Sequence, residues 1–309
     1  MSVCATIPAN VVQLTGPQLL GFAGNWALFG CVSVQVYMYH VSFPNDRWPL
    51  KLLVYGLFIW DVLQTMLYTS SVFSWLGSNW GNATAMDKPG ITWFTIPFMS
   101  GVASAAVQCF YAWRIFILSN SKLLTLFIVM IALMEGSAAM ADGVMTKIGV
   151  NSFAELQNKN FAVTTVWLLG SAVCDIIICV SMTYYLSRAR KITGYKSTEN
   201  MLTRLINLAV GTGLLTASIA IIAAILFIVY RNNNYHIVPD DVIGKLYTNA
   251  LMVQFNSRRR EIDDTDKYTW DGEHRSKSLL SLNLNPKDIA VTVNIHENIE
   301  KGGSDSTSY

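Results

Sequence analysis

The sequence predicts an all-α polytopic membrane protein, a bundle of seven transmembrane helices with its N-terminus outside and its C-terminus in the cytosol. Hydrophobic residues make up 52% of the 309 residues and charged residues only 14%, whereas soluble domains carry about 25% charged residues. The charges are also unevenly placed, because residues 1–257 hold 14 Lys and Arg with 10 Asp and Glu, while the last 52 residues hold 8 and 10. The net charge of +2 gives no indication of a nucleic-acid partner.

Seven apolar segments approach the roughly 20 residues that cross a bilayer core about 30 Å thick. The seventh is the most polar, because Lys245, Asn249 and Gln254 interrupt it. The basic run that follows, Arg258-Arg259-Arg260, still favours a span, since positive charges collect where a helix leaves the membrane on the cytosolic side. The seven expected spans lie at about 18–41, 50–74, 92–118, 122–144, 162–187, 204–230 and 238–256.

The Lys and Arg residues of the connections predict the orientation. Those near the first, third and fifth connections number nine: Arg47, Lys51, Arg114, Lys122, Arg188, Arg190, Lys191, Lys196 and Arg204. Those on the other side number four: Lys88, Lys147, Lys159 and Arg231. This excess places the first, third and fifth connections in the cytosol. The one N-x-[ST] sequon, at Asn82, falls in the expected outer loop after the second span and is a candidate glycosylation site.

The end of the chain has a different composition from the seven spans. It is polar, mixed in charge and rich in Ser, Thr and Asn, so we expect a disordered cytosolic tail. The predicted organisation is a short extracellular N-terminus at 1–17, a seven-helix domain at 18–257 and the tail at 258–309.

Charged side chains inside the expected spans cost roughly 2.5–3.5 kcal/mol each on insertion scales, so each of them requires a physical reason. They are Asp61, Glu135, Asp175 and Lys245, and Asn249 lies one turn from Lys245 on the same helix face. One interpretation is a polar cavity in the membrane core that these five residues line, in which Lys245 pairs with an acid. The other is a buried polar cluster that only fixes helix packing.

No cofactor or metal is expected. Asp241 and Lys245 have the D-x-x-x-K spacing of the last helix of microbial rhodopsins, in which the Lys carries retinal. The third span holds no Asp or Glu for the counterion region, and an ion pair between residues i and i+4 at the helix end is the simpler explanation. The four His residues are dispersed, without the spacing of metal ligands.

A set of short segments carries a resemblance that extends over about 33–258. They are Ser33-Val34-Gln35-Val36-Tyr37, Phe43-Pro44-Asn45-Asp46-Arg47, Phe110-Tyr111-Ala112-Trp113-Arg114-Ile115, Cys174-Asp175-Ile176-Ile177-Ile178, Ser181-Met182-Thr183-Tyr184-Tyr185-Leu186, Thr212-Gly213, Gly244-Lys245-Leu246-Tyr247 and Ser257-Arg258. In these segments the chain resembles a group of basidiomycete seven-helix membrane proteins with a C-terminal domain of unknown function. The resemblance implies a fungal protein of the plasma membrane or the endomembrane system, and no activity.

Receptor-like signalling is the favoured function, because seven spans, short loops and a Ser- and Thr-containing cytosolic tail suit it. Arg114, Arg188, Arg190 and Lys191 would face a cytosolic partner near the basic fifth connection, and the lipid bilayer is the other expected partner. The third span lacks the acid-Arg-aromatic triplet of the commonest G-protein-coupled receptors. The analogy with those receptors is therefore one of topology.

A small-solute or proton- or cation-coupled transporter is the alternative, supported by the acids and Lys245 in the membrane core. Helix breaks are few, since Pro97 is the one proline well inside a span. An enzyme is least favoured, because Asp61 and Asp175 lack a Gly-x-Gly-Asp setting and no His lies near them in the sequence. The ligand, the membrane and the oligomeric state stay open.

Overall fold

The structure is a computed structural model that describes residues 11–79, 90–149, 158–192, 196–230 and 234–258. The chain divides into two compact units, Met1–Arg258 and Arg259–Tyr309. All described residues belong to the first unit. The sequon at Asn82 and the expected tail beyond Arg258 lie outside the described residues.

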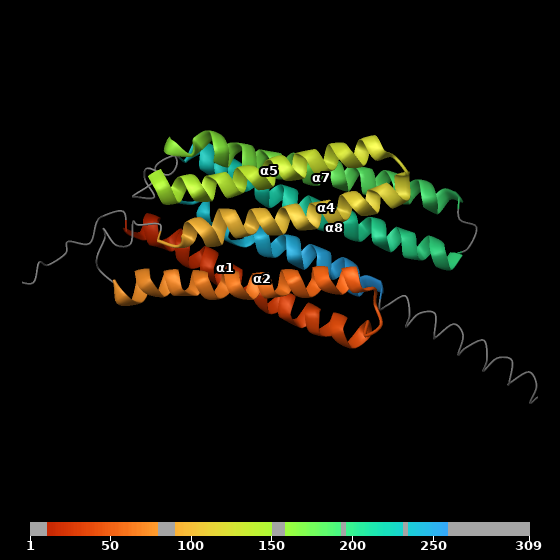
Figure 1. Ribbon diagram of the computed structural model, residues 1–309, viewed down its shortest axis with the longest axis horizontal. Helices are drawn as coiled ribbons and strands as arrows, with labels where there is room; N and C mark the ends of the chain where they lie inside the picture. The colour runs from red at the N-terminus through yellow and green to blue at the C-terminus, as the bar shows by residue number, and fades with distance from the viewer. Residues whose placement is uncertain (1–10, 80–89, 150–157, 193–195, 231–233, 259–309) are drawn as a thin grey trace, which may run out of the picture. The chain divides into compact units, whose positions relative to one another are not determined.

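The described part of the chain forms seven long helices that run side by side, alternating in direction (Figure 1). A π-helical segment extends α2, and another leads into α4, so that Pro97 lies where the backbone is wound more loosely. The last helix, here called the seventh helix, covers residues 237–258. The other elements are α1 (Val11–Ser42), α2 (Trp48–Phe73), η1 (Ser74–Ser78), η2 (Phe94–Phe98), α4 (Met99–Ser119), α5 (Lys122–Gly149), α7 (Phe161–Ile192) and α8 (Lys196–Val229).

Six of these helices are long and apolar enough to cross a membrane: Thr15–Ser42, Trp48–Ser78, Phe94–Ser119, Lys122–Gly149, Phe161–Lys191 and Met201–Val229. Their outer surfaces expose large apolar side chains such as Leu133, Val180 and Ile225. An apolar surface of this extent requires a lipid environment. The all-α fold and the integral membrane character are thereby confirmed. The first helix begins at Val11, before the expected position 18, and therefore contains Pro17.

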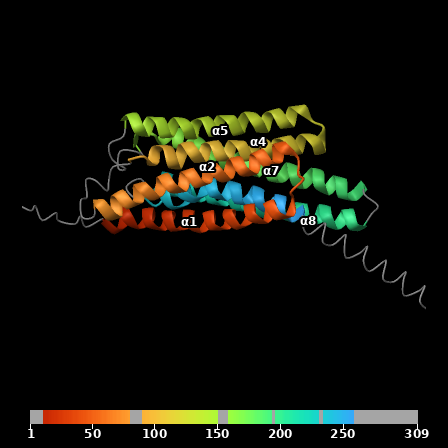
Figure 2. The same ribbon diagram turned by 60° about the horizontal axis from the view of Figure 1, so that its bottom comes forward.

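Small residues bring α4 and α5 close together. A Cβ atom added at Gly101 would lie 2.6 Å from the Cβ of Ala139, and one added at Gly136 would lie 3.0 Å from the Cβ of Ala105. Inside a membrane, where water does not drive helices together, such close backbone approach is a main source of packing energy. The two helices accordingly lie against each other along much of their length (Figure 2).

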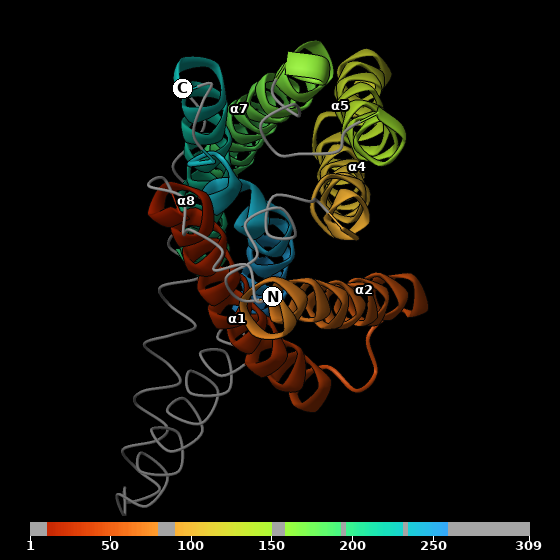
Figure 3. The ribbon, with the colours of Figure 1, turned by 90° about the vertical axis from the view of Figure 1, so that its left-hand side faces the viewer.

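The seventh helix lies in the middle of the bundle. Viewed along the helices, it lies among α1, α2, α4 and α8 (Figure 3). Its residues are buried or half-buried throughout, and Lys245 is completely inaccessible. Gly21 of α1 is in such close contact with Asp241 that a Cβ there would collide with the Asp241 carboxylate. The most polar helix is therefore covered by protein, and its polar groups do not face lipid.

The bundle has two chemically different ends. The connections at 43–47 and 120–121, the end of α7 and the beginning of α8 lie at one end, on the right in Figure 1, and Arg258 lies there because it bonds to Asp46. We call it the basic end, because the exposed side chains of Arg188, Arg190 and Lys191 lie there. The opposite end contains the beginning of the seventh helix and η2.

Candidate functional site

A buried ion pair joins the seventh helix to α2. The Lys245 ammonium donates to the backbone O of Asp61 (2.9 Å), to its carboxylate Oδ1 (3.2 Å) and to Oε1 of Gln64 (2.8 Å). These three bonds use all three donors of the ammonium group. Asp61 and Gln64 lie about one turn apart on α2 and therefore reach the same group. We call Asp61, Gln64, Lys245 and Asn249 the lysine cluster.

Asn249 extends the lysine cluster towards α1. Its amide nitrogen donates to the backbone O of Lys245 at 2.8 Å and to the backbone O of Leu28 at 3.2 Å. Its side-chain oxygen accepts from Nε2 of Gln35 at 3.4 Å. The cluster thus ties three helices together through side chains that would be costly to bury without partners.

A second cluster lies on the other side of the seventh helix and contains no cation. Tyr247 donates from its hydroxyl to Oδ2 of Asp175 (2.8 Å), and its oxygen lies 2.6 Å from Oγ of Ser171. Gln108 of α4 donates to Oδ1 of Asp175 at 3.0 Å. We call Tyr247, Asp175, Gln108 and Ser171 the tyrosine cluster. Positions 245 and 247 are about 200° apart around a helix, which explains why neighbouring polar residues take part in different clusters.

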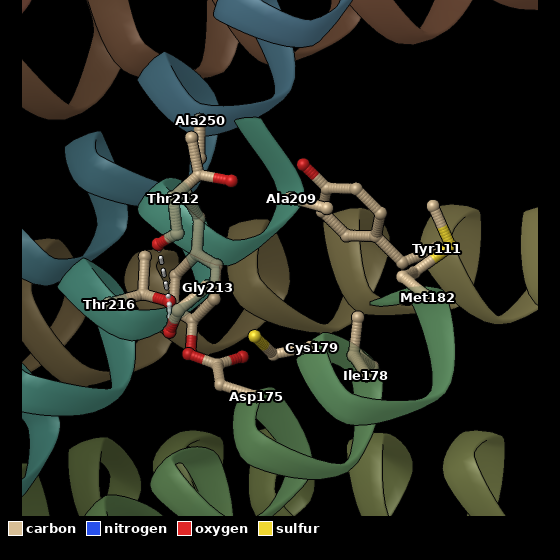
Figure 4. Close-up of a pocket in the computed structure, with 11 residues that line it drawn as sticks. Tyr111, Asp175, Ile178, Cys179, Met182, Ala209, Thr212, Gly213, Thr216 and Ala250 are labelled. Carbon is tan, nitrogen blue, oxygen red and sulfur yellow. Dashed lines mark hydrogen bonds between the residues drawn. The ribbon is translucent and has the colours of Figure 1, made fainter. Parts of the chain in front are cut away.

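A cavity of about 20 Å³ adjoins the tyrosine cluster, lined in part by Asp175, Tyr111, Thr212 and Thr216 (Figure 4). A volume of this size holds about one water molecule. Pockets for organic ligands are larger by an order of magnitude. In this conformation the cavity is therefore suited to water or a small ion.

Glu135 lies apart from both clusters. Oγ of Ser104 donates to its Oε1 at 3.0 Å, and its Oε2 has no hydrogen-bond partner among the described residues. Gly170 of α7 packs against it, since a Cβ at Gly170 would lie 3.0 Å from the Cβ of Glu135. The structure thus brings Asp61, Lys245 and Asn249 together, but places Asp175 and Glu135 in separate surroundings.

The expected ion pair within the seventh helix does not form. Lys245 pairs with Asp61 at 3.2 Å, whereas the carboxylate of Asp241 accepts a hydrogen bond from the hydroxyl of Tyr68. The backbone O of Asp241 accepts from the amide nitrogen of Asn25 at 2.8 Å. An ion pair across helices replaces one along the helix because α2 presents both a carboxylate and an amide oxygen to the ammonium group.

Several further polar residues are buried in the bundle although their sequence positions did not single them out. Asp142 on α5 is buried, and Thr164 donates to its carboxylate at 2.5 Å. Its position seven residues after Glu135, on the same helix face, was the signal for it. Gln108 and Tyr247 carried no comparable signal, because a single amide or phenol in a span does not indicate its partner.

At the basic end a partly exposed ion pair joins Arg258 to Asp46. Arg258 donates from Nη2 to the carboxylate of Asp46 at 2.5 Å, and Tyr39 donates to the same oxygen at 2.8 Å. Burial on its own raises the pKa of the Asp46 carboxyl. The hydrogen bonds from Arg258, Tyr39 and the backbone of Arg47, with the Arg258 charge, outweigh burial and lower this pKa below its usual value.

The predicted partner residues lie at this same end but do not form one cluster. Arg188, Arg190 and Lys191 on α7 are exposed, whereas Arg114 on α4 is half-buried. Arg190 pairs with Glu199 at 3.1 Å, and both side chains are accessible. Such exposed pairs contribute little to stability. The exposed side chains of Arg188, Arg190 and Lys191 are accessible to a binding partner.

Fold and site together define a multi-pass α-helical membrane protein with a polar core around its last helix. Residues 171–260 match the model of a family of unknown function, DUF6534. The match begins at Ser171 of the tyrosine cluster and includes Lys245, which confirms the expected domain of unknown function. Comparison with curated proteins and with solved structures finds no match.

Proposed function

We propose that the protein is a receptor-like signalling protein in which the seventh helix transmits a change from one end of the bundle to the other. The observation that carries this proposal is that polar side chains along the length of the seventh helix form hydrogen bonds with other parts of the bundle. Asp241 does so near the opposite end, Lys245 and Tyr247 in the middle, and Arg258 at the basic end. When a helix with polar contacts on both sides rotates slightly, its side chains exchange one set of hydrogen-bond partners for another. Two such sets define two discrete states, which a two-state switch needs.

In this proposal all seven helices cross the membrane, with the N-terminus outside and the basic end in the cytosol. The exposed cations at the basic end support this orientation. Asn82 would then be extracellular and open to glycosylation. The resemblance to basidiomycete proteins supports a fungal origin and a plasma-membrane or endomembrane location. Catalysis is not part of the proposal, because Asp61 and Asp175 are engaged by Lys245 and Tyr247 and do not face one another.

The orientation has a direct test in fungal cells. Treatment of the protein with an N-glycosidase should increase its gel mobility, and Asn82→Gln should remove that change. A tag at the C-terminus should be accessible to antibody only after permeabilisation. A C-terminal tag that is accessible on intact cells would contradict the orientation.

The signalling proposal is tested by proximity labelling with a biotin ligase fused to the C-terminus. We expect selective recovery of a G-protein α subunit or a kinase, compared with a second seven-helix protein in the same membrane. The triple variant Arg188→Ala, Arg190→Ala, Lys191→Ala should lose that recovery, because it removes the exposed cations of the basic end.

The matched control is Lys147→Ala, which removes an exposed cation at the opposite end. Recovery of only general membrane proteins by the wild type, or equal recovery by the triple variant, would contradict the proposal.

Proton- or cation-coupled transport is the second candidate. The observation that favours it is the series of buried carboxylate oxygens without hydrogen-bond partners among the described residues, including Glu135 Oε2 and Asp240 Oδ1. Such groups require a proton, a water molecule or an ion. Proton flux into liposomes that contain the purified protein, reduced in Glu135→Gln, would support transport. Flux equal to that of empty liposomes would exclude it.

A further inference from the structure

A cavity of about 40 Å³ lies at the opposite end of the bundle, between η2, α5, α7 and the seventh helix. Two carboxylates line it, those of Asp142 and Asp240, together with hydroxyl groups that include those of Thr146 and Thr164. We call it the acid cavity. It is separate from the lysine and tyrosine clusters, neither of which contributes a residue to it.

Asp142 is held in place by its neighbours. Thr164 donates to its Oδ1 at 2.5 Å, and the amide of Asn160 donates to its backbone O at 3.1 Å. The same amide donates to Oγ1 of Thr146 at 2.8 Å. One wall of the acid cavity is therefore a fixed arrangement of oxygen atoms that α5 and α7 supply jointly.

Asp240 supplies the other carboxylate and is the unsatisfied group. Its residue is 5% exposed, and its Oδ1 has no hydrogen-bond partner among the described residues. The residues that line the cavity include no Lys or Arg, and their one basic side chain is the imidazole of His236. Lys147 is not among these residues. Its ammonium group lies 4.5 Å from the centre of the Trp93 ring, and its side chain is exposed.

Two buried carboxylates in a cavity without Lys or Arg in its lining cannot both stay charged unless positive charge is added, because an unpaired buried charge is strongly unfavourable. One bound monovalent cation and one proton, carried by a carboxyl group or by the imidazole of His236, balance the two acids. The volume admits a small ion with one or two water molecules. A calcium ion would need six to eight oxygen ligands. The described residues contain no group of three or more His, Cys, Asp or Glu that could hold a metal ion.

We propose that the acid cavity binds a sodium ion between Asp142 and Asp240, with hydroxyl oxygens and water completing its coordination. The ion joins α5 and α7 to the beginning of the seventh helix. Because it bridges the helix that we propose to transmit the signal, its binding favours one packing of that helix over others. The sodium site does not depend on the receptor proposal, and its test measures binding alone.

The test is the melting temperature of the purified full-length protein in detergent, in sodium chloride and in N-methyl-D-glucamine chloride at equal ionic strength. A ligand that binds only the folded state stabilises it in proportion to the logarithm of its concentration. We expect a saturable rise of about 3–6 °C with sodium. Asp240→Asn should remove the sodium-dependent rise, because the remaining carboxylate is already engaged by Thr164.

Glu199→Gln is the matched control, since it removes an exposed carboxylate at the basic end and should keep the full rise. Binding of radioactive sodium to the wild-type protein, displaced by unlabelled sodium and not by N-methyl-D-glucamine, tests the site without any variant. Equal melting temperatures in the two salts, or an unchanged rise in Asp240→Asn, would overturn the proposal. A rise with calcium and none with sodium would overturn the choice of a monovalent ion.

Discussion

On the α2 side of the seventh helix the carboxylate of Asp61 lies against an ammonium group, whereas on the α7 side the carboxylate of Asp175 lies against a phenol and an amide. Both acids are buried in the same bundle. In the lysine cluster the charges of Lys245 and Asp61 cancel. The loss of either side chain leaves the charge of the other unbalanced. The tyrosine cluster depends only on hydrogen bonds, and a protonated or amide side chain can replace its acid. The two sides therefore differ in what a substitution should cost.

The largest expected effect is that of Lys245→Met, which leaves Asp61 buried beside uncharged groups. Removal of one partner from a buried ion pair costs about 3–5 kcal/mol. We expect a loss of this size in the free energy of unfolding, measured in detergent micelles. The double variant Lys245→Met, Asp61→Asn should recover most of it, since no buried charge is then left alone. A single variant as stable as the wild type would show that the ion pair does not hold the helices together.

Replacement of Asp by Asn should have a larger effect at Asp61 than at Asp175. Asp61→Asn leaves the buried ammonium of Lys245 without its counter-charge and should cost about 3 kcal/mol. Asp175→Asn keeps an oxygen that accepts from Tyr247 and should cost about 1 kcal/mol. Melting temperatures of the two variants, purified side by side, measure the difference. Equal losses would mean that the cation is not what distinguishes the clusters.

Tyr247→Phe weakens the tyrosine cluster without changing its charge. It removes the donor to Asp175 and the partner of Ser171, and unsatisfied buried groups cost about 1–3 kcal/mol. We expect a loss of about 1–2 kcal/mol in the free energy of unfolding. Tyr184→Phe, on the exposed surface of α7, is the matched control and should leave stability unchanged. A loss that is larger than that of Lys245→Met would reverse the comparison.

The smallest expected effect is at the basic end, where Asp46 and Arg258 form a pair that solvent reaches. The pKa of Asp46 is lowered in the folded protein, so its contribution is complete above its unfolded value of about 3.9 and is lost as the pH falls below it. Asp46→Asn should cost about 1 kcal/mol or less at neutral pH and reduce the loss of stability in acid. Unfolding free energies measured between pH 6 and 3 test this. An unchanged acid response in the variant would contradict it.

The helices themselves could be predicted from the sequence, because membrane spans are set by local properties, length and apolar composition. The spans expected at 122–144 and 162–187 fall within α5 and α7. The span expected at about 18–41 lies within α1, but the helix begins earlier, at Val11, and includes Pro17 in its first turns. Proline near a helix start removes few hydrogen bonds and does not mark the boundary.

The partners of the polar residues could be predicted only in part. The presence of Lys245 and three acids in the spans predicted a pairing, and Asn249 follows from the spacing of one turn. The choice of Asp61 over Asp241 could not be predicted. Asp241 lies four residues from Lys245 and Asp61 lies 184 residues away, and only the packing of α2 against the seventh helix brings Asp61 to the ammonium group. Asp240 lies in the first turn of the seventh helix, and its burial comes from the packing of neighbouring helices, which the sequence does not reveal.

By itself the sequence determined the class of the protein, the position of its helices and the unusual polarity of the last one, because each depends on local composition and helical periodicity. Only the tertiary structure decided that this polar helix lies in the centre of the bundle. It also decided that Lys245 pairs with Asp61, and that Asp142 and Asp240 share a cavity. These are contacts between segments far apart in the chain, and their geometry is set by the packing of all seven helices together.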